Sequence, residues 1–213
     1  MSRVLNFSQF IGESDEQKKI EHIYDKTGKE VERIIMTLSG SSSGEITRLV
    51  NKFVETYDLL KKAQEAHDDA KEILKDSINK SFKEEERFIT RIIKTVKYAQ
   101  TFSKYTKEKH EEKVEIDYNK AFKEIMEVFP EIKEGLNEII KNHTQTVKTF
   151  KKETSGAIKY SHIDVNEGIT DILKGTANAL KTMFASLYRT LRRLGSSIDK
   201  KFKTLDRLMK IKG

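Results

Sequence analysis

The sequence predicts an all-α protein, an elongated helical bundle or coiled coil of long amphipathic helices. Charged residues make up 35% of the chain and hydrophobic residues only 36%, against typical values of about 25% and about 45–50%. There is one proline and no tryptophan. Apolar residues recur at steps of three and four over most of the 213 residues, which is the spacing of one helix face. This combination favours long exposed helices over a compact globule.

A first amphipathic helix is expected to begin at residue 14 or 15, because Ser14 and Asp15 are both good N-terminal caps. Its apolar stripe comprises Ile20, Ile23, Tyr24, Val31, Ile34, Ile35 and Leu38. Residues 39–44 are only serine and glycine, a composition typical of flexible connectors. We therefore expect a break near 39–44 and an antiparallel return of the next helix.

The segment 45–129 contains neither glycine nor proline, and its helical stripe predicts one very long helix or a hairpin. An unbroken helix of this length would reach roughly 130 Å. The apolar rhythm fades over residues 103–115, where charged side chains dominate, so a second break is expected there. Pro130 predicts a third, because proline suits the first turn of a helix and disrupts its interior.

The remaining chain divides into a helix that ends near residue 155, a linker over 156–168 and a last amphipathic helix over 169–213. Gly195-Ser196-Ser197 is the weak point of that last helix. The predicted organisation is thus a leader at 1–13, a helical body at 14–155, the linker, and a C-terminal helical tail.

The net positive charge of the chain lies in its C-terminal tail. Residues 174–213 contain eleven lysines and arginines but only two aspartates, whereas the whole chain has a formal charge of +7. Such an asymmetry predicts an anionic partner for this end. The candidate nucleic-acid-binding residues are Lys181, Arg189, Arg192, Arg193, Lys200, Lys201, Lys203, Arg207, Lys210 and Lys212.

Two other uses of this basic helix remain open. Its cations could pair with acidic neighbours inside the bundle. Alternatively, the helix could lie on a membrane surface with Phe184, Tyr188 and Phe202 inserted; we favour DNA and do not expect a membrane partner.

No motif predicts catalysis, a cofactor or a metal. The chain has no cysteine, which excludes thiolate chemistry and cysteine-based metal sites. The histidines at 22, 67, 110, 143 and 162 stand in no recognised ligand motif, so solvent-facing positions are expected. The adjacent carboxylates of Glu84-Glu85-Glu86 are expected to form a solvated helix face. No apolar run approaches the 18 residues of a membrane span.

The N-terminus holds a short apolar stripe at helical spacing, Val4, Phe7, Phe10 and Ile11, followed by Gly12-Glu13-Ser14. The stretch from Phe7 to Glu13 resembles the capsid-targeting peptide of internal head proteins from T-even-type phages, whose pattern is Phe-x-x-Phe-(Ile/Leu)-x-Glu. The resemblance covers about the first 14 residues. It implies a targeting peptide at Phe7, Phe10 and Ile11, and a cleavage site at Ile11, Glu13 and Ser14 that the prohead protease would cut after Glu13.

The resemblance also implies phage scaffold or capsid proteins as partners, synthesis in the host cytoplasm and a final place inside the virion. The expected function is a non-enzymatic virion structural protein with DNA at its basic C-terminal helix. The alternative is a helical assembly protein, of a phage tail, neck or baseplate or of a bacterium, whose N-terminal stripe is core and which is not processed. The stripe pattern leaves open whether the helices are buried within one chain or between identical chains.

Overall fold

The computed structural model describes residues 15–71, 79–108, 117–160 and 165–209. In these residues all regular secondary structure is α-helical, which confirms the predicted all-α fold. The helices are α1 (Asp15–Leu38), α2 (Gly44–Lys71), α3 (Asn79–Glu108), α4 (Tyr118–Met126), α5 (Phe129–Tyr160) and α6 (Val165–Leu208).

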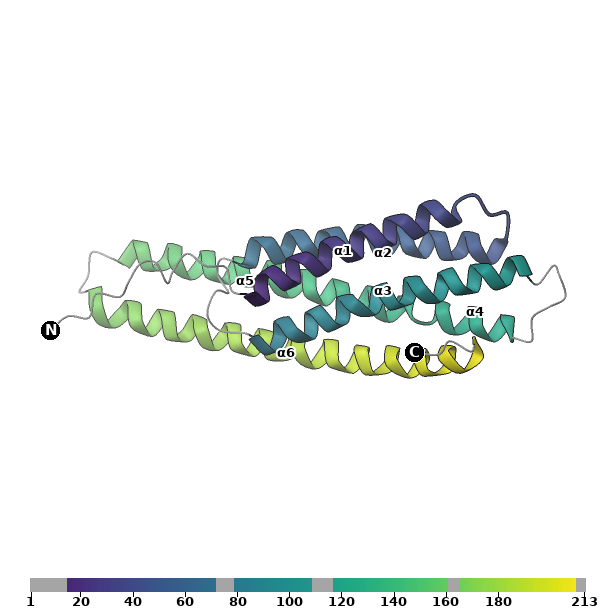
Figure 1. Cartoon of the computed structure of the whole chain (residues 1–213). Coiled ribbons are helices and arrows are strands. Elements are labelled where there is room, and N and C mark those ends of the chain that lie inside the picture. The colour runs from purple at the N-terminus through teal and green to yellow at the C-terminus, as the bar shows by residue number, and fades with distance from the viewer. Residues whose placement is uncertain (1–14, 72–78, 109–116, 161–164, 210–213) are drawn as a thin grey trace.

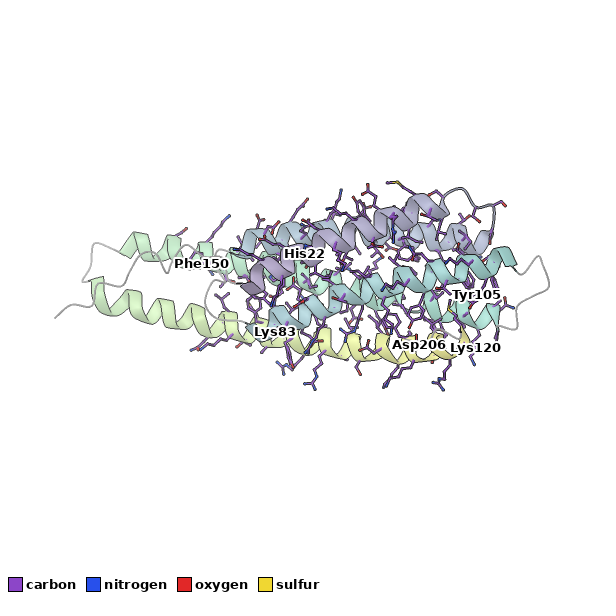
Figure 2. All side chains as sticks on the ribbon, in the orientation of Figure 1. His22, Lys83, Tyr105, Lys120, Phe150 and Asp206 are labelled. Carbon is purple, nitrogen blue, oxygen red and sulfur yellow. The ribbon has the colours of Figure 1, made fainter. Side chains whose placement is uncertain are left out.

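The long helices pack side by side into an elongated bundle (Figure 1). The long helices follow the cyclic order α1, α2, α5, α6, α3 and back to α1, each packing against the next. In addition, α3 contacts α5 across the bundle, and short α4 packs against α3 and α6. Lys83 of α3 and Asp206 of α6 lie along the edge where those two helices meet (Figure 2). The bundle thus places helices from the two ends of the sequence next to each other.

The first predicted helix and its stripe are confirmed. Ile20, Tyr24, Val31 and Ile34 of α1 are at most 1% exposed. The Ser-Gly connector separates α1 from α2, and the two helices pack against each other as expected. The apolar periodicity therefore identified the buried face of α1 correctly.

The segment without glycine or proline is divided among separate helices. α2 ends at Lys71 and α3 begins at Asn79, and α3 packs on α1 and α6. Ile73 and Ile78 continue the apolar spacing across that point, so periodicity gave no sign of this division. The break expected near 103–115 agrees with the structure, because α3 ends at Glu108 and a separate helix, α4, begins at Tyr118.

Pro130 lies in the first turn of α5, the position that its ring tolerates. The linker predicted for 156–168 is wrong at both ends, since α5 runs to Tyr160 and α6 starts at Val165. No proline interrupts this stretch, and each of its two glycines, at 156 and 168, costs a helix only about 1 kcal/mol. α6 also continues through Gly195, and α5 and α6 extend beyond the other helices at one end (Figure 1).

The predicted leader, with Phe7, Phe10, Ile11, Glu13 and Ser14, lies outside the described residues. Across the helices that are described, none is both long and apolar enough to cross a membrane.

Candidate nucleic-acid interface

The cations of α6 gather on one side of the helix. Its buried positions include Phe184, Leu191, Ile198 and Phe202, which face the core. At 3.6 residues per turn, the exposed cations occupy about a third of the circumference beside that stripe. They are Lys181, Arg189, Arg192, Arg193, Lys200, Lys203 and Arg207.

The neighbouring helix α3 adds cations to the same side. A groove of about 680 Å³ between α3 and α6 is lined by six cationic and three acidic side chains. The cationic ones are Arg87, Arg91, Lys94, Arg192, Lys200 and Lys203. We call these six residues the α3–α6 basic surface.

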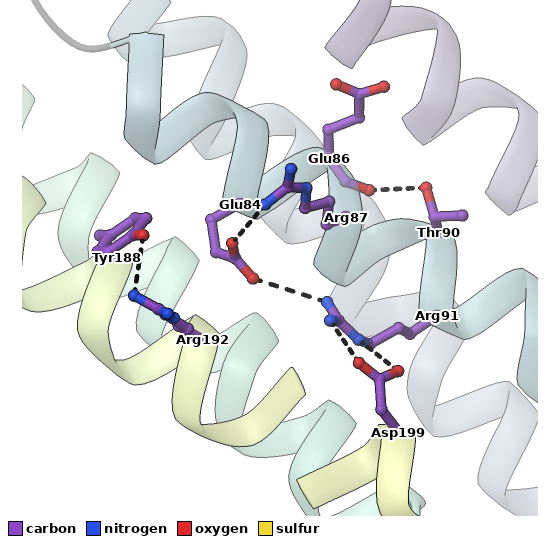
Figure 3. Close-up of polar contacts among 8 residues, drawn as sticks. All are labelled: Glu84, Glu86, Arg87, Thr90, Arg91, Tyr188, Arg192 and Asp199. Carbon is purple, nitrogen blue, oxygen red and sulfur yellow. Dashed lines mark hydrogen bonds and ion pairs between the residues drawn. The ribbon is translucent and has the colours of Figure 1, made fainter. Parts of the chain in front are cut away.

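The acidic groups of the groove are already bound to α3. Asp199 accepts two hydrogen bonds from Arg91, at 3.1 Å to Nε and 2.8 Å to Nη2 (Figure 3). Glu84 lies 3.4 Å from Arg87 and 3.8 Å from Arg91. These carboxylates are therefore neutralised by α3 and not by the cations of α6.

Asp206 is bound to α3 in the same way. It accepts a hydrogen bond from the hydroxyl of Tyr98 and lies 3.8 Å from Lys94. Burial and the Asp206 carboxylate raise the pKa of Tyr98, so its hydroxyl stays a proton donor.

Several cations of α6 on this side have no acidic partner in the described part of the chain. Among the described residues, Lys181, Lys200 and Lys203 have no ion-pair partner. Arg192 donates to the hydroxyl of Tyr188 at 3.4 Å (Figure 3). A row of exposed cations whose neighbouring carboxylates are bound to another helix is an arrangement that attracts a polyanion.

Two predicted nucleic-acid residues instead bind the bundle. Lys201 lies 2.9 Å from Glu131 of α5 with its side chain only 19% exposed, and Arg193 lies 2.5 Å from Glu134 of α5. The alternative of pairing within the bundle thus applies to these two residues. Lys210 and Lys212 lie outside the described residues.

A small residue makes the contact between α3 and α6 possible. A Cβ atom at Gly195 would come within 2.6 Å of the Arg91 guanidinium carbon. Because Gly195 has no side chain, Arg91 lies across α6 and reaches Asp199 one turn further on. Gly195, expected to weaken the last helix, thus makes room for the ion pair between Arg91 of α3 and Asp199 of α6.

Two of the three aromatic residues considered for membrane insertion, Phe184 and Phe202, are not available for it in this fold, whereas Tyr188 is half-buried. Phe184 and Phe202 are each 1% exposed, and Phe202 packs on Tyr98 of α3 with ring centroids 5.0 Å apart. Insertion into a bilayer would require α6 to leave the bundle.

The expectation of solvent-facing histidines is wrong for His67 of α2 and His143 of α5, which are fully buried. So is the expectation of a solvated face at Glu84-Glu85-Glu86, because Glu84 is 4% exposed and Glu85 is fully buried. Successive residues on a helix point to different sides, and here they face α6, the core and the exterior. His22 is exposed as expected.

These buried groups form a second polar cluster, which we call the Glu85 cluster: Tyr24, His67, Glu85 and His143. Glu85 accepts a hydrogen bond from the Tyr24 hydroxyl at 2.8 Å. Its two carboxylate oxygens lie 3.2 Å from His67 Nδ1 and 3.0 Å from His143 Nε2. The four side chains come from α1, α2, α3 and α5, so only the fold brings them together.

Electrostatics keep the centre of this cluster ionised. Burial alone would raise the pKa of Glu85, but the charges and hydrogen bonds of His143 and His67 hold it well below its usual value. Burial likewise opposes the charged form of His67, yet Glu85, with Asp68 and Glu21, raises the pKa of His67 above its ordinary 6.5. The cluster is thus a buried carboxylate held by three donors.

No protein-family model, curated protein or solved structure matches this chain. The comparisons therefore assign no function to the α3–α6 basic surface or to the Glu85 cluster.

Proposed function

We propose that this chain is a non-enzymatic structural protein of a phage virion, packaged inside the head, whose basic helix α6 contacts DNA. The observation that carries the proposal is the one-sided row of exposed cations on α6. Their acidic neighbours Asp199 and Asp206 are bound to α3. Because such contacts are made to phosphates and not to bases, binding is independent of sequence and weakens steeply with salt.

The N-terminal sequence supports the location inside the head. Phe7, Phe10 and Ile11 supply the targeting pattern, and Glu13 and Ser14 flank the cleavage position. The described bundle begins at Asp15, so cleavage after Glu13 would remove none of its helices. Removal of residues 1–13 takes away one cation, Arg3, and one anion, Glu13, so the formal charge stays the same.

The DNA part is tested by mobility shift of the full chain with random-sequence duplex DNA at low salt. The variant Arg192→Gln/Lys200→Gln/Lys203→Gln removes three cations of the α3–α6 basic surface. The matched control, Lys19→Gln/Lys26→Gln/Lys29→Gln, removes three exposed cations from α1, which contacts α2 and α3. We expect a loss of affinity of at least tenfold in the first variant and a much smaller loss in the control. Equal losses would show that only net charge matters and would contradict a specific surface.

The processing part is tested separately, by mass spectrometry of purified particles that contain this chain. The expected N-terminal peptide begins at Ser14, and no peptide contains Phe7. An intact terminus at Met1 or Ser2 would contradict cleavage and favour an unprocessed helical assembly protein.

A further inference from the structure

The Glu85 cluster is a rare arrangement for the core of a helical bundle. Tyr24, His67, Glu85 and His143 are each fully buried. Phe82 and Phe184 pack beside the imidazoles, with ring centroids 5.4 Å from His67 and 6.0 Å from His143. Charged and polar side chains are seldom placed in such a dry site unless they are paired or bind a metal.

Two buried polar atoms of the Glu85 cluster have no hydrogen-bond partner. Each imidazole directs one nitrogen at Glu85, while His67 Nε2 and His143 Nδ1 are buried with no hydrogen-bond partner. Unpaired buried polar atoms are uncommon and costly. The four side chains therefore do not satisfy one another fully.

The donor atoms converge as metal ligands do. His67, Glu85 and His143 each offer a ligand atom, and these atoms lie within 4.8 Å of one another. Neighbouring ligands of tetrahedral zinc, with bonds of about 2.0–2.1 Å, lie about 3.3 Å apart. The observed separations from the carboxylate oxygens are 3.2 Å to His67 Nδ1 and 3.0 Å to His143 Nε2.

We propose that His67, Glu85 and His143 form a structural Zn²⁺ site that joins α2, α3 and α5. The ligands are His67 Nδ1, His143 Nε2 and the carboxylate of Glu85, whose two oxygens face the two imidazoles and together supply the third and fourth donor atoms of a four-coordinate site. Tyr24 lies outside the ligand set and orients the carboxylate by its hydrogen bond to Oε1, as groups around metal ligands commonly do.

The donor chemistry favours a nitrogen-binding transition ion, among which we assign zinc. Two imidazole nitrogens and one carboxylate suit Zn²⁺, whereas Mg²⁺ and Ca²⁺ prefer oxygen donors only. The ligand atoms offer no thiolate for soft ions. Metals in bundle cores are held in this manner, by side chains from facing helices. Because the ligands come together only in the folded chain, zinc is expected to stabilise the fold.

The first test uses the full chain, stripped with a chelator and titrated with ZnCl₂. Native mass spectrometry should find one Zn²⁺ per chain, and the thermal midpoint should rise by roughly 5 °C or more in excess metal. Co²⁺ in place of Zn²⁺ should give the intense visible absorption of a tetrahedral site. Absence of bound metal, together with an unchanged midpoint, would overturn the proposal.

Variants locate the site. Glu85→Gln and His143→Gln should abolish the zinc-dependent rise, whereas the control His22→Gln, an exposed histidine of α1, should retain it. A full response in Glu85→Gln would overturn the assignment. If these variants fail to fold, anomalous diffraction at the zinc edge from the wild-type protein locates the ion directly. An ion found elsewhere would also refute the proposal.

Discussion

Arg91 of α3 lies over Gly195 of α6 and donates two hydrogen bonds to Asp199, 108 residues further along the chain. Two parallel bonds from one guanidinium to one carboxylate give a defined geometry and a stronger pair than a single contact. The same pair neutralises the Asp199 carboxylate in the α3–α6 groove with a cation of α3. One interaction therefore links the packing of α6 to its electrostatic character.

Replacing Asp199 should separate these two effects. Asp199→Asn weakens the pair with Arg91, and since the Asp199 side chain is 48% exposed, we expect a loss of about 1 kcal/mol of unfolding free energy. DNA affinity should increase, because a carboxylate leaves the groove. Urea unfolding and a DNA titration measure the two quantities. Weaker DNA binding by a fully folded variant would contradict the position of the groove.

Gly195→Ala should act through Arg91. The new Cβ would meet the end of a flexible side chain, so Arg91 can move aside at the cost of its bonds to Asp199. We expect about 1 kcal/mol of destabilisation, and the double variant with Asp199→Asn should lose less than the sum of the two single losses. A double-mutant cycle in urea measures this coupling, and strict additivity would show that Gly195 does not act through the pair.

Gly135 should be far less tolerant. A Cβ there would lie 2.0 Å from the ring of Phe88, which is fully buried. Overpacking a filled core typically costs about 1–3 kcal/mol, and Gly135→Ala should fall at the upper end. The matched control is Gly28→Ala in α1, where nothing lies within 4 Å. It should stabilise the helix by about 0.5–1 kcal/mol. Similar effects of the two substitutions would contradict the close contact of α3 and α5.

The Glu85 cluster predicts a stability maximum in mildly acidic solution for metal-free protein. The pKa of Glu85 is lowered on folding, so its contribution is present above its ordinary pKa of 4.5 and lost as pH falls below it. The pKa of His67 is raised, so its contribution is present below 6.5 and lost as pH rises through its folded value.

For Glu85 and His67, urea midpoints measured from pH 3 to pH 9 should therefore be highest between pH 4.5 and pH 6.5. Glu85→Gln should flatten both sides of the profile, whereas the exposed-histidine variant His22→Gln should leave it unchanged. A wild-type profile with the same shape as that of Glu85→Gln would contradict the assignment.

The sequence was sufficient for much of the fold. Apolar spacing identified the buried face of α1, and the Ser-Gly stretch and Pro130 marked real helix ends. It did not separate α2 from α3, because Ile73 and Ile78 maintain the spacing where the helices divide. It also predicted a linker where α5 and α6 are helical. The apolar spacing is weak there, but a segment can form a helix without a regular apolar face.

The two candidate sites also differ in how far the sequence predicts them. The cations of α6 are close in sequence, so composition alone identified them. His67, Glu85 and His143 lie on separate helices, and a single sequence offers no spacing that connects them. The one available signal was position: His67 follows Leu60 and Ala63, and His143 follows Ile139 and Ile140, at the spacing of the buried faces.

The most direct test of the proposed DNA contact is the salt dependence of binding by the full wild-type chain to random-sequence duplex DNA. Each neutralised phosphate contributes about −0.9 to the slope of log affinity against log salt. With Arg192, Lys200 and Lys203 engaged, we predict a slope of about −3 or steeper, falling towards zero in the triple glutamine variant. Absence of binding at low salt, or a slope that this variant leaves unchanged, would contradict the account.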